Sequence, residues 1–290
     1  MYVIEIIPIS RGILSDSLSY FTSKEIGIGA IVTVPLRNKN INGIVISVKK
    51  AEDMKSEIKS AGFALKKIDK IKSIDFFTEA FMEMINEVAQ YYATSTGAIL
   101  NILVPKYIQE NIGKLKSIKD GKVIRKKEAL TVKEKYAVQG DHEERYGTWK
   151  GLIRQEFAKK KSVMFVMPTI EDVEYAFELF EKGIEGYAFI LHGSMTPKKI
   201  LEVWNNIMSE KHPIVVITTG GFLPLPRDDI ETIVVENESS RSYKIPRRPF
   251  LDIRNVCEIY ANKRGIKIFF ADSLLRIETL WRESEGEIEI

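Results

Sequence analysis

Five short apolar runs in the second half of the chain constrain its fold more than any other feature. They are residues 163–167, 188–191, 214–217, 232–235 and 266–270. Runs this apolar are typical of strands buried on both faces, as in parallel sheets covered by helices. The stretches between the first three carry helix signals, since Thr169 with Asp172 resembles a capping box and Thr196 precedes Pro197 at a natural first helical position. Residues 136–290 are therefore predicted to form a parallel α/β lobe.

The first half has a different pattern. Its short runs rich in β-branched residues are separated by Gly, Asn, Ser and Lys, and they cover residues 2–8, 30–35, 42–48 and 65–71. Such runs are typical of strands in a small β-domain. Residues 76–92 then repeat apolar side chains at helical spacing, which predicts an amphipathic helix. We expect a β-domain over residues 1–105, a basic linker over 106–135, and the α/β lobe after it.

Charge is unevenly distributed between the two halves. Residues 1–135 hold 22 Lys/Arg against 15 Asp/Glu, whereas the remaining residues hold 21 against 25. The span 106–135 alone has ten basic and four acidic residues. A basic half is the candidate for contact with a polyanion such as nucleic acid. A charge run of this kind is equally typical of a solvated linker or an outer hairpin, and both interpretations stay open.

The composition argues against several other classes of function. A single cysteine, Cys257, cannot form an internal disulfide, and three scattered histidines lack the spacing of metal ligands. No basic and apolar leader begins the chain, and no apolar run approaches the ~18 residues of a membrane span. We therefore expect a cytoplasmic protein without a metal or another cofactor.

Several motifs then occur in an order that resembles one family. They are PISRGILSDSLSYF, VTVPLRNKNINGIVISV, VAQYYATSTGAIL, VMFVMPTIEDV, LHGSMTPKKILEVW, ITTGGFLPLP, VVENESSRSYK and FFADSLLRIET. Each motif is loose by itself, but their order and spacing are similar to those of the replication-restart helicase family of primosomal protein N′, PriA. The resemblance covers about residues 1–110 and 136–282.

The resemblance implies a fold for each half. The first domain would be a small β-barrel related to the OB-fold that captures the 3′ end of a DNA strand, and the second would be the first of two RecA-like helicase lobes. The family's intervening winged-helix domain needs more residues than 106–135 provides, so we expect it to be missing. The zinc-binding insertion, the second lobe and the C-terminal domain would follow residue 290 and are expected to be absent.

The resemblance also locates the family's nucleotide motifs, and all three are altered. Residues Gly140 to Trp149 replace the glycine-rich phosphate loop and carry three carboxylates where phosphates would lie. Residues 236–239 read Glu-Asn-Glu-Ser in place of Asp-Glu-Glu-His, and 271–275 replace Gly-Ser-Ala-Thr-Pro. An amide at Asn237 cannot act as a base. We expect a lobe without ATPase activity, in which 236–239 form a surface turn after a core strand.

For DNA contact, the resemblance implies a site with three parts. They are Leu18, Ser19 and Tyr20, the hairpin loop with Arg37, Asn38 and Lys39, and Lys66. Tyr20 and Lys66 match the family, but Ser19 replaces an acid that accepts a hydrogen bond from the terminal 3′-hydroxyl, and Arg37 replaces a glycine. Tyr20 could stack on a base while the cations meet phosphates. Alternatively, Tyr20 belongs to the core, and Lys66 with the lysines that follow it is a solvated sheet edge.

The sequence thus favours a DNA-binding protein that acts in primosome assembly or replication restart without its own ATPase or helicase activity. Its expected partners are single-stranded or forked DNA, with single-strand-binding protein or other primosome proteins as further candidates. The alternative is a scaffold that no longer binds DNA and docks to replication or repair proteins. A third hypothesis is an ATPase completed in trans by another chain.

Overall fold

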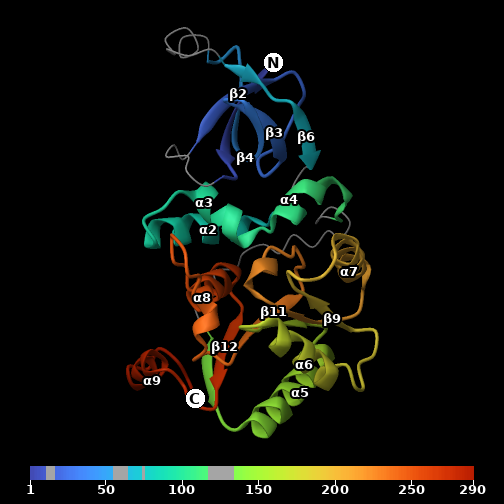
Figure 1. Ribbon diagram of the computed structural model, residues 1–290, viewed down its shortest axis with the longest axis vertical. Coiled ribbons are helices and arrows are strands. Elements are labelled where there is room, and N and C mark those ends of the chain that lie inside the picture. The colour runs from blue at the N-terminus through green and yellow to red at the C-terminus, as the bar shows by residue number, and fades with distance from the viewer. Residues whose placement is uncertain (11–16, 55–64, 74–75, 117–133) are drawn as a thin grey trace. The chain divides into compact units, whose positions relative to one another are not determined.

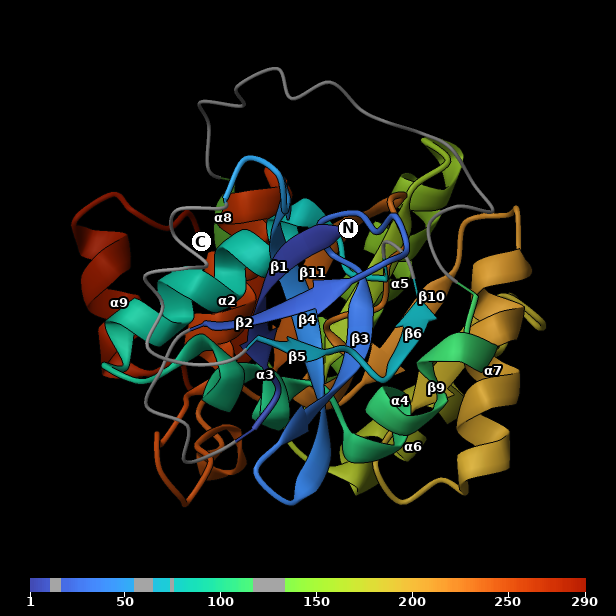
Figure 2. The ribbon, with the colours of Figure 1, turned by 90° about the horizontal axis from the view of Figure 1, so that it is seen from above.

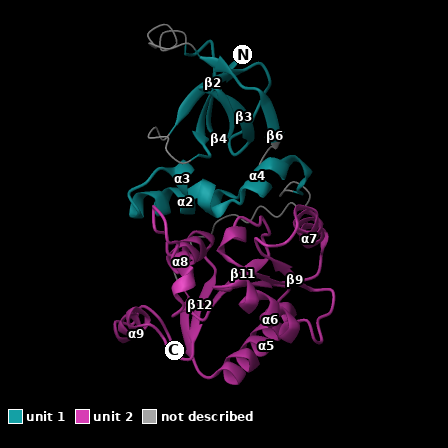
Figure 3. Cartoon of the chain, in the orientation of Figure 1, with its two compact units in different colours: residues 1–121 teal, residues 122–290 magenta. Residues whose placement is uncertain are grey.

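The structure, a computed structural model, describes residues 1–10, 17–54, 65–73, 76–116 and 134–290 (Figure 1). The chain divides into two compact units, Met1–Gly121 and Lys122–Ile290 (Figure 3). None of the described helices is both long and apolar enough to cross a bilayer. Each unit is built around one six-stranded sheet.

Unit 1 begins with an antiparallel arrangement of long strands. These are β1 (Tyr2–Pro8), β2 (Leu18–Thr22), β3 (Ile31–Leu36) and β4 (Lys39–Lys50). The strand order is β5-β2-β1-β4-β3-β6, so the hairpin of β3 and β4 lies beside β1. The register of β1 with β4 shifts between Glu5 and Ile6, and such a bulge bends a strand and increases its twist. A strongly bent sheet can enclose a core on one face.

The segment expected as one strand over 65–71 is two short strands at opposite edges of this sheet. Strand β5 (Lys66–Lys67) pairs in parallel with β2, and β6 (Lys70–Ser73) pairs with β3. Between them, the Ile68 N–H donates to the Phe21 carbonyl at 3.1 Å and the Asp69 N–H donates to Thr33 at 2.9 Å. The sheet therefore closes on itself through this segment (Figure 2). The enclosed cluster comprises Ile4, Ile6, Tyr20, Ile26, Ala30, Val32, Val34, Val45 and Ile68.

Helices follow the closed sheet. They are α2 (Glu79–Tyr91), α3 (Thr96–Leu103), α4 (Lys106–Asn111) and the short η1 (Ile112–Lys114). Helix α2 confirms the predicted amphipathic segment, and the Thr78 hydroxyl caps it by accepting from the Phe81 N–H at 3.1 Å. Helix α3 approaches the end of β1 so closely that a Cβ on Gly97 would lie 2.0 Å from the Pro8 carbonyl oxygen.

This close approach predicts a large effect of one methyl group. We expect Gly97→Ala to lower the free energy of unfolding by about 1–3 kcal/mol, because backbone has to move to admit the Cβ. The matched control is Gly147→Ala, at a helical glycine with open space around its Cβ position. The control is expected to stabilise by about 0.5–1 kcal/mol, since alanine favours helix. Denaturant unfolding measures both, and equal effects would contradict the close contact.

Part of the segment expected as a linker belongs to unit 1. Ile108 and Ile112 are buried, and the Gln109 carbonyl accepts from the Asn42 side chain at 3.2 Å and from Lys72 at 3.3 Å. Residues 106–114 therefore fold back on the β-domain, since the Gln109 carbonyl accepts from Asn42 of β4 and Lys72 of β6. Residues 117–133 of the expected linker lie outside the described residues.

Unit 2 confirms the predicted parallel sheet. Its strands are β7 (Lys135–Gln139), β8 (Ser162–Val166), β9 (Ala188–Leu191), β10 (Val215–Thr218), β11 (Ile230–Glu236) and β12 (Lys267–Asp272). They run in the order β7-β12-β11-β8-β10-β9, and every neighbouring pair is parallel. The five apolar runs all fall in this sheet. Strand β7 was not predicted, because its run Lys-Tyr-Ala-Val-Gln is short and half polar.

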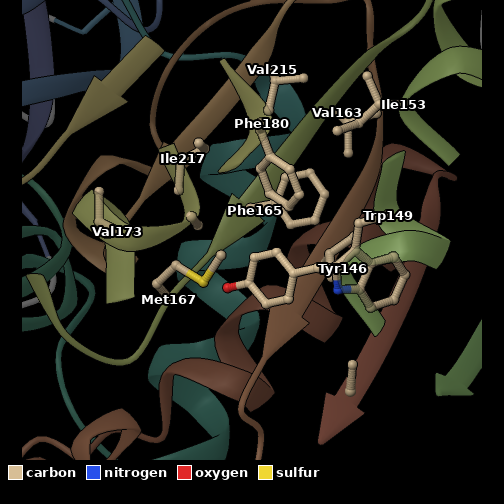
Figure 4. Packing of buried hydrophobic residues seen from close by; sticks show 13 residues of the cluster. Tyr146, Trp149, Ile153, Val163, Phe165, Met167, Val173, Phe180, Val215 and Ile217 are labelled. Carbon is tan, nitrogen blue, oxygen red and sulfur yellow. The ribbon is translucent and has the colours of Figure 1, made fainter. Parts of the chain in front are cut away.

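Helices cover both faces of this sheet. They are α5 (His142–Ala158), α6 (Ile170–Phe180), α7 (Pro197–Ser209) and α8 (Ile253–Arg264), and α9 (Ile277–Ser284) follows at the margin of the unit. One face of the sheet packs with α5 and α6 around Trp149, Phe165 and Phe180 (Figure 4). Helix α8 packs on β11 and β12 from the other side and buries Cys257 (Figure 1). Because β7, β12 and β11 are parallel neighbours, their carboxyl ends meet at one edge of the sheet.

Candidate nucleic-acid interface and the carboxyl edge of the parallel sheet

Tyr20 lies inside the closed sheet of unit 1. Its side chain is 4% exposed, and its hydroxyl donates to the Pro35 carbonyl at 3.0 Å. Burial raises the pKa of this phenol above its ordinary value. A ring packed on all sides offers no face to a base, so the structure favours the core interpretation of Tyr20 over stacking.

The expected cations gather around Tyr20. Lys66 is the cross-strand partner of Tyr20, and the Tyr20 hydroxyl reaches Pro35 just before the turn that carries Arg37. The Asn40 amide next to Lys39 donates to the Asp69 carboxylate at 3.3 Å, which ties the β3–β4 turn to the closing segment. Arg37, Lys39, Lys66 and Lys67 are all exposed, and we call them the cation group. The fold thus brings together three parts of the chain that are distant in sequence.

Ser19 and Leu18 lie differently from Tyr20. Side chains alternate along a strand, so Ser19 faces away from the core that holds Tyr20. Its cross-strand partner is Glu5 of β1, on the same outer face. Leu18 is partly buried against the core cluster. The expected triplet therefore does not form one surface, because only Ser19 is directed outward.

The hydrogen bond of Tyr20 carries a stability prediction. Replacing Tyr20 by phenylalanine keeps the ring and removes the donor, which leaves the Pro35 carbonyl with one partner fewer. We expect Tyr20→Phe to lower the free energy of unfolding by about 0.5–1.5 kcal/mol. Tyr91→Phe, at an exposed tyrosine of the same unit, is the control and is expected to change nothing. Equal stability of both variants would contradict the buried bond.

Arg145 of α5 joins the ends of three strands in unit 2. Its Nε donates to Glu236 Oε1 at 2.8 Å, at the end of β11. One terminal nitrogen donates to the Gly140 carbonyl at 2.7 Å and to Ser273 Oγ at 2.8 Å, while the other donates to Asn237 Oδ1 at 3.0 Å. These partners belong to the same three segments, 140–149, 236–239 and 271–275, that align with the family's nucleotide motifs. We call Arg145, Glu236 and their hydrogen-bonded partners the Arg145 cluster.

Glu236 and Glu238 correct the expectation of a surface turn, since both are fully buried. Glu236 Oε2 accepts from the Trp149 indole N–H at 2.8 Å, so both of its oxygens have protein donors. Burial raises the pKa of Glu236, and the Arg145 charge opposes that shift. The turn is buried because its carboxylates find donors within the fold.

Glu238 is also occupied by protein groups. Its Oε1 accepts from the Arg276 backbone N–H at 2.9 Å and its Oε2 accepts from Thr279 Oγ1 at 2.8 Å. Burial raises the pKa of this carboxyl as well. Neither glutamate therefore has an oxygen that is free of a protein donor. Among the described residues, no group of three or more His, Cys, Asp or Glu is placed to hold a metal ion.

The segment compared with a phosphate loop is the start of α5. Asp141 Oδ1 accepts from the Glu144 N–H at 3.0 Å, and Glu144 Oε2 accepts from the Asp141 N–H at 3.1 Å. This capping box satisfies first-turn donors with the chain's own carboxylates. A phosphate-binding helix start needs such donors free and no carboxylate beside them. The observed arrangement is suited to hold a helix rather than an anion.

Sequence reasoning missed the role of Arg145, although a signal is present. Tyr146, Trp149 and Ile153 form one apolar face of α5, and Arg145 precedes Trp149 by four residues, one helical turn. A cation on a buried face requires a buried acceptor. The candidate acceptors are the two glutamates after the apolar run 232–235. The sequence pattern alone predicts a surface turn for them.

The chain resembles known proteins in both units. Residues 6–105 match the family described as the 3′ DNA-binding domain of PriA. A protein named replication restart protein PriA from Helicobacter pylori is 22% identical over 263 residues, which cover 88% of this chain and 40% of the relative. One of the same name from Rickettsia conorii is 26% identical over 289 residues, 92% of this chain and 42% of the relative. The chain spans about two fifths of the length of these curated relatives.

Solved structures resemble the chain more distantly. The UvsW helicase from bacteriophage T4 aligns with a TM-score of 0.35 and 10% identity, over 78% of this chain and 71% of that one. The C-terminal domain of yeast Dbp5, solved with Gle1 and IP6, aligns with a TM-score of 0.40 and 14% identity, over 55% of this chain and 88% of that one. Similarity at this level carries no weight for function.

Proposed function

We propose that this chain binds single-stranded or forked DNA in replication restart or primosome assembly. The premise is that residues 6–105 match the 3′ DNA-binding domain of PriA. The observation that carries the proposal is the exposed cation group at the β3–β4 turn and on the segment that closes the sheet of unit 1. Cations on a rigid closed sheet can meet successive phosphates without rearrangement.

The chemistry of this surface is electrostatic. Arg37, Lys39, Lys66 and Lys67 can neutralise phosphates and release counterions, which makes affinity depend steeply on salt. Tyr20 is buried, so base stacking by this ring contributes nothing to the proposed contact. We therefore infer binding that is insensitive to base sequence and is positioned by the sugar-phosphate backbone.

Recognition of a free 3′ end depends on the residue at position 19. Ser19 faces away from Tyr20 and lies opposite Glu5, and a neutral hydroxyl is a weaker acceptor than a carboxylate. We infer that the chain distinguishes a free 3′-hydroxyl from a blocked end only weakly.

A fork with two kinds of end tests both parts. Fluorescence anisotropy would compare a forked oligonucleotide carrying a free 3′-hydroxyl with the same fork phosphorylated at that end, at two salt concentrations. The proposal predicts salt-sensitive binding to both forks with affinities within about twofold. A strong preference for the free end would assign selectivity to unit 1 despite Ser19. Absence of binding at low salt would favour the docking scaffold.

We further propose that unit 1 is an OB-related barrel and that unit 2 is a RecA-like lobe without nucleotide binding. The Arg145 cluster supports this proposal, because a guanidinium already occupies the acceptors where the three strand ends meet. Glu236, at the position of the family's Mg²⁺-binding Asp, and the neighbouring Glu238 are both satisfied within the protein. Introducing a triphosphate would require breaking these bonds.

The expected result of an ATPase assay is phosphate release at background, with and without forked DNA. The same preparation has to show the blue-shifted indole emission of the buried Trp149 and Trp204, which indicates that unit 2 is folded. Release above background that is abolished by Glu238→Gln would contradict the proposal and support an ATPase completed in trans. The assay therefore separates loss of the nucleotide site from loss of the protein's fold.

A docking scaffold is the second candidate function. It is favoured by one observation, the exposure of large apolar side chains on α9, and it does not require the cation group. The fork assay separates the two functions, since a scaffold that no longer binds DNA shows no affinity for either fork at low salt.

A further inference from the structure

Helix α9 has its polar side toward the protein. Thr279 is its buried residue, and the Thr279 hydroxyl donates to Glu238. Arg282 donates to both carboxylate oxygens of Glu258 in α8, at 3.0 and 2.5 Å. A surface helix ordinarily turns its apolar stripe inward and its polar residues to water. In α9 the attachment is made by a hydroxyl and a guanidinium instead.

The apolar side chains of α9 face solvent. Leu274, just before the helix, is 74% exposed, and Ile277, Leu280 and Trp281 are 79%, 40% and 60% exposed. Residues three and four apart share a helix face, so Ile277, Leu280 and Trp281 form one stripe. Figures 1 and 2 show α9 at the margin of unit 2, outside the helices that cover the sheet. Adjoining exposed apolar residues of this size are typical of an interaction site.

Acidic residues border this stripe on both sides. Successive residues of a helix are about 100° apart, so Glu278 lies on one flank of the stripe and Glu283 on the other. Glu285 follows directly, and all three are exposed. Arg276 pairs with Glu278 of the border at 2.8 Å, and Arg282 pairs with Glu258 and Glu287. One arginine against the three border glutamates leaves the border net acidic.

We propose that the outer face of α9, formed by Leu274, Ile277, Leu280 and Trp281 between Glu278 and Glu283, docks a basic amphipathic helix of a partner protein. An apolar stripe on the partner would cover Ile277 and Trp281, and lysines or arginines on its flanks would face the glutamates. A second copy of this face is disfavoured, because its glutamates would oppose glutamates. Anionic lipid is disfavoured for the same reason.

Synthetic peptides of defined charge test the proposal on the full chain. One peptide is an amphipathic helix with leucines on one face and lysines on its flanks, and the other carries glutamates in place of the lysines. Trp149 and Trp204 are fully buried, so a change in indole emission on binding reports on Trp281. The basic peptide is expected to bind at least tenfold more tightly than the acidic one.

Two variants and one control locate the contact. The double variant Ile277→Ser, Trp281→Ser should lower the affinity for the basic peptide at least tenfold, as measured by calorimetry. Glu278→Lys with Glu283→Lys should reverse the preference toward the acidic peptide. Ile28→Ser, at an exposed isoleucine of unit 1, should leave binding unchanged. Since α9 is attached through Thr279 and Arg282, these surface changes leave the attachment intact.

Other outcomes would overturn the proposal. Equal binding of both peptides, or binding that survives the Ile277 and Trp281 substitutions, would remove α9 as the site. Sedimentation that detects dimers in the unaltered chain, lost on the same substitutions, would assign the face to a second copy.

Discussion

Replacing Arg145 by methionine is expected to lower the free energy of unfolding by about 3–5 kcal/mol, the cost of removing one partner from a buried ion pair. Both members are buried, at 2% and 0% side-chain exposure, so Glu236 would lose a donor without gaining water. The loss also leaves Asn237, Ser273 and the Gly140 carbonyl without their guanidinium donor. Denaturant unfolding followed by circular dichroism measures the change.

Two variants make this measurement specific. Arg154→Met changes an exposed arginine of the same helix and should shift stability by less than about 0.5 kcal/mol. Arg145→Met combined with Glu236→Leu removes both charges, and it should be much less destabilised than Arg145→Met alone. A double variant as unstable as the sum of its single changes would contradict the ion pair.

The deficit should also depend on pH. Burial raises the pKa of Glu236 in the folded protein, and Arg145 is the main influence that lowers it. When the pKa of a carboxyl group is higher in the folded protein than in the unfolded chain, the free energy of unfolding falls as the pH rises from the unfolded pKa through the folded pKa. Without Arg145 the folded pKa rises further and this window widens. The Arg145→Met deficit should therefore be smaller at pH 5 than at pH 8.

The second large effect concerns DNA. Arg37→Ala with Lys39→Ala is expected to weaken binding of a forked oligonucleotide by roughly tenfold or more at low salt. The physical reason is the loss of two phosphate contacts at the β3–β4 turn. The slope of log affinity against log salt should fall in magnitude by about 1.4, which corresponds to two contacts on a single strand. Anisotropy at four or more salt concentrations gives both values.

The matched control uses the other end of the same strand. Lys49 and Lys50 end β4, are exposed, and carry the same total charge as Arg37 and Lys39. Lys49→Ala with Lys50→Ala should leave the affinity within about threefold of the unaltered chain, because only long-range attraction is lost. Equal weakening by the two pairs would show that net charge, rather than the cation group, determines binding.

The sequence predicted the parallel sheet and α2 because periodicity reports how much of each element is buried. The family resemblance implies a β-barrel in unit 1, but periodicity does not show how its sheet closes, because two residues in β5 and four in β6 are too short to show a period. That closure depends on hydrogen bonds from Ile68 and Asp69 to strands distant in sequence. The placement of Tyr20 in the core follows from the same closure.

The Arg145 cluster shows a different limit. Charged residues are rarely buried, so the sequence alone predicts a solvent-exposed turn for Glu236 and Glu238 after an apolar run. Their burial depends on donors from α5 and from the start of α9, which no local pattern contains. The sequence shows that residues 140–149 lack a glycine-rich pattern. The hydrogen bonds of Arg145 to this segment and to two strand ends became evident only from three-dimensional contacts.

The proposed DNA contact lies on the closing segment and the β3–β4 turn of unit 1. Amide hydrogen exchange of the chain, free and with excess forked oligonucleotide at low salt, locates such a contact. We expect slower exchange over residues 35–40 and 66–70, with the effect lost at high salt. Slowing confined to unit 2, or no change at any DNA concentration, would contradict this proposal.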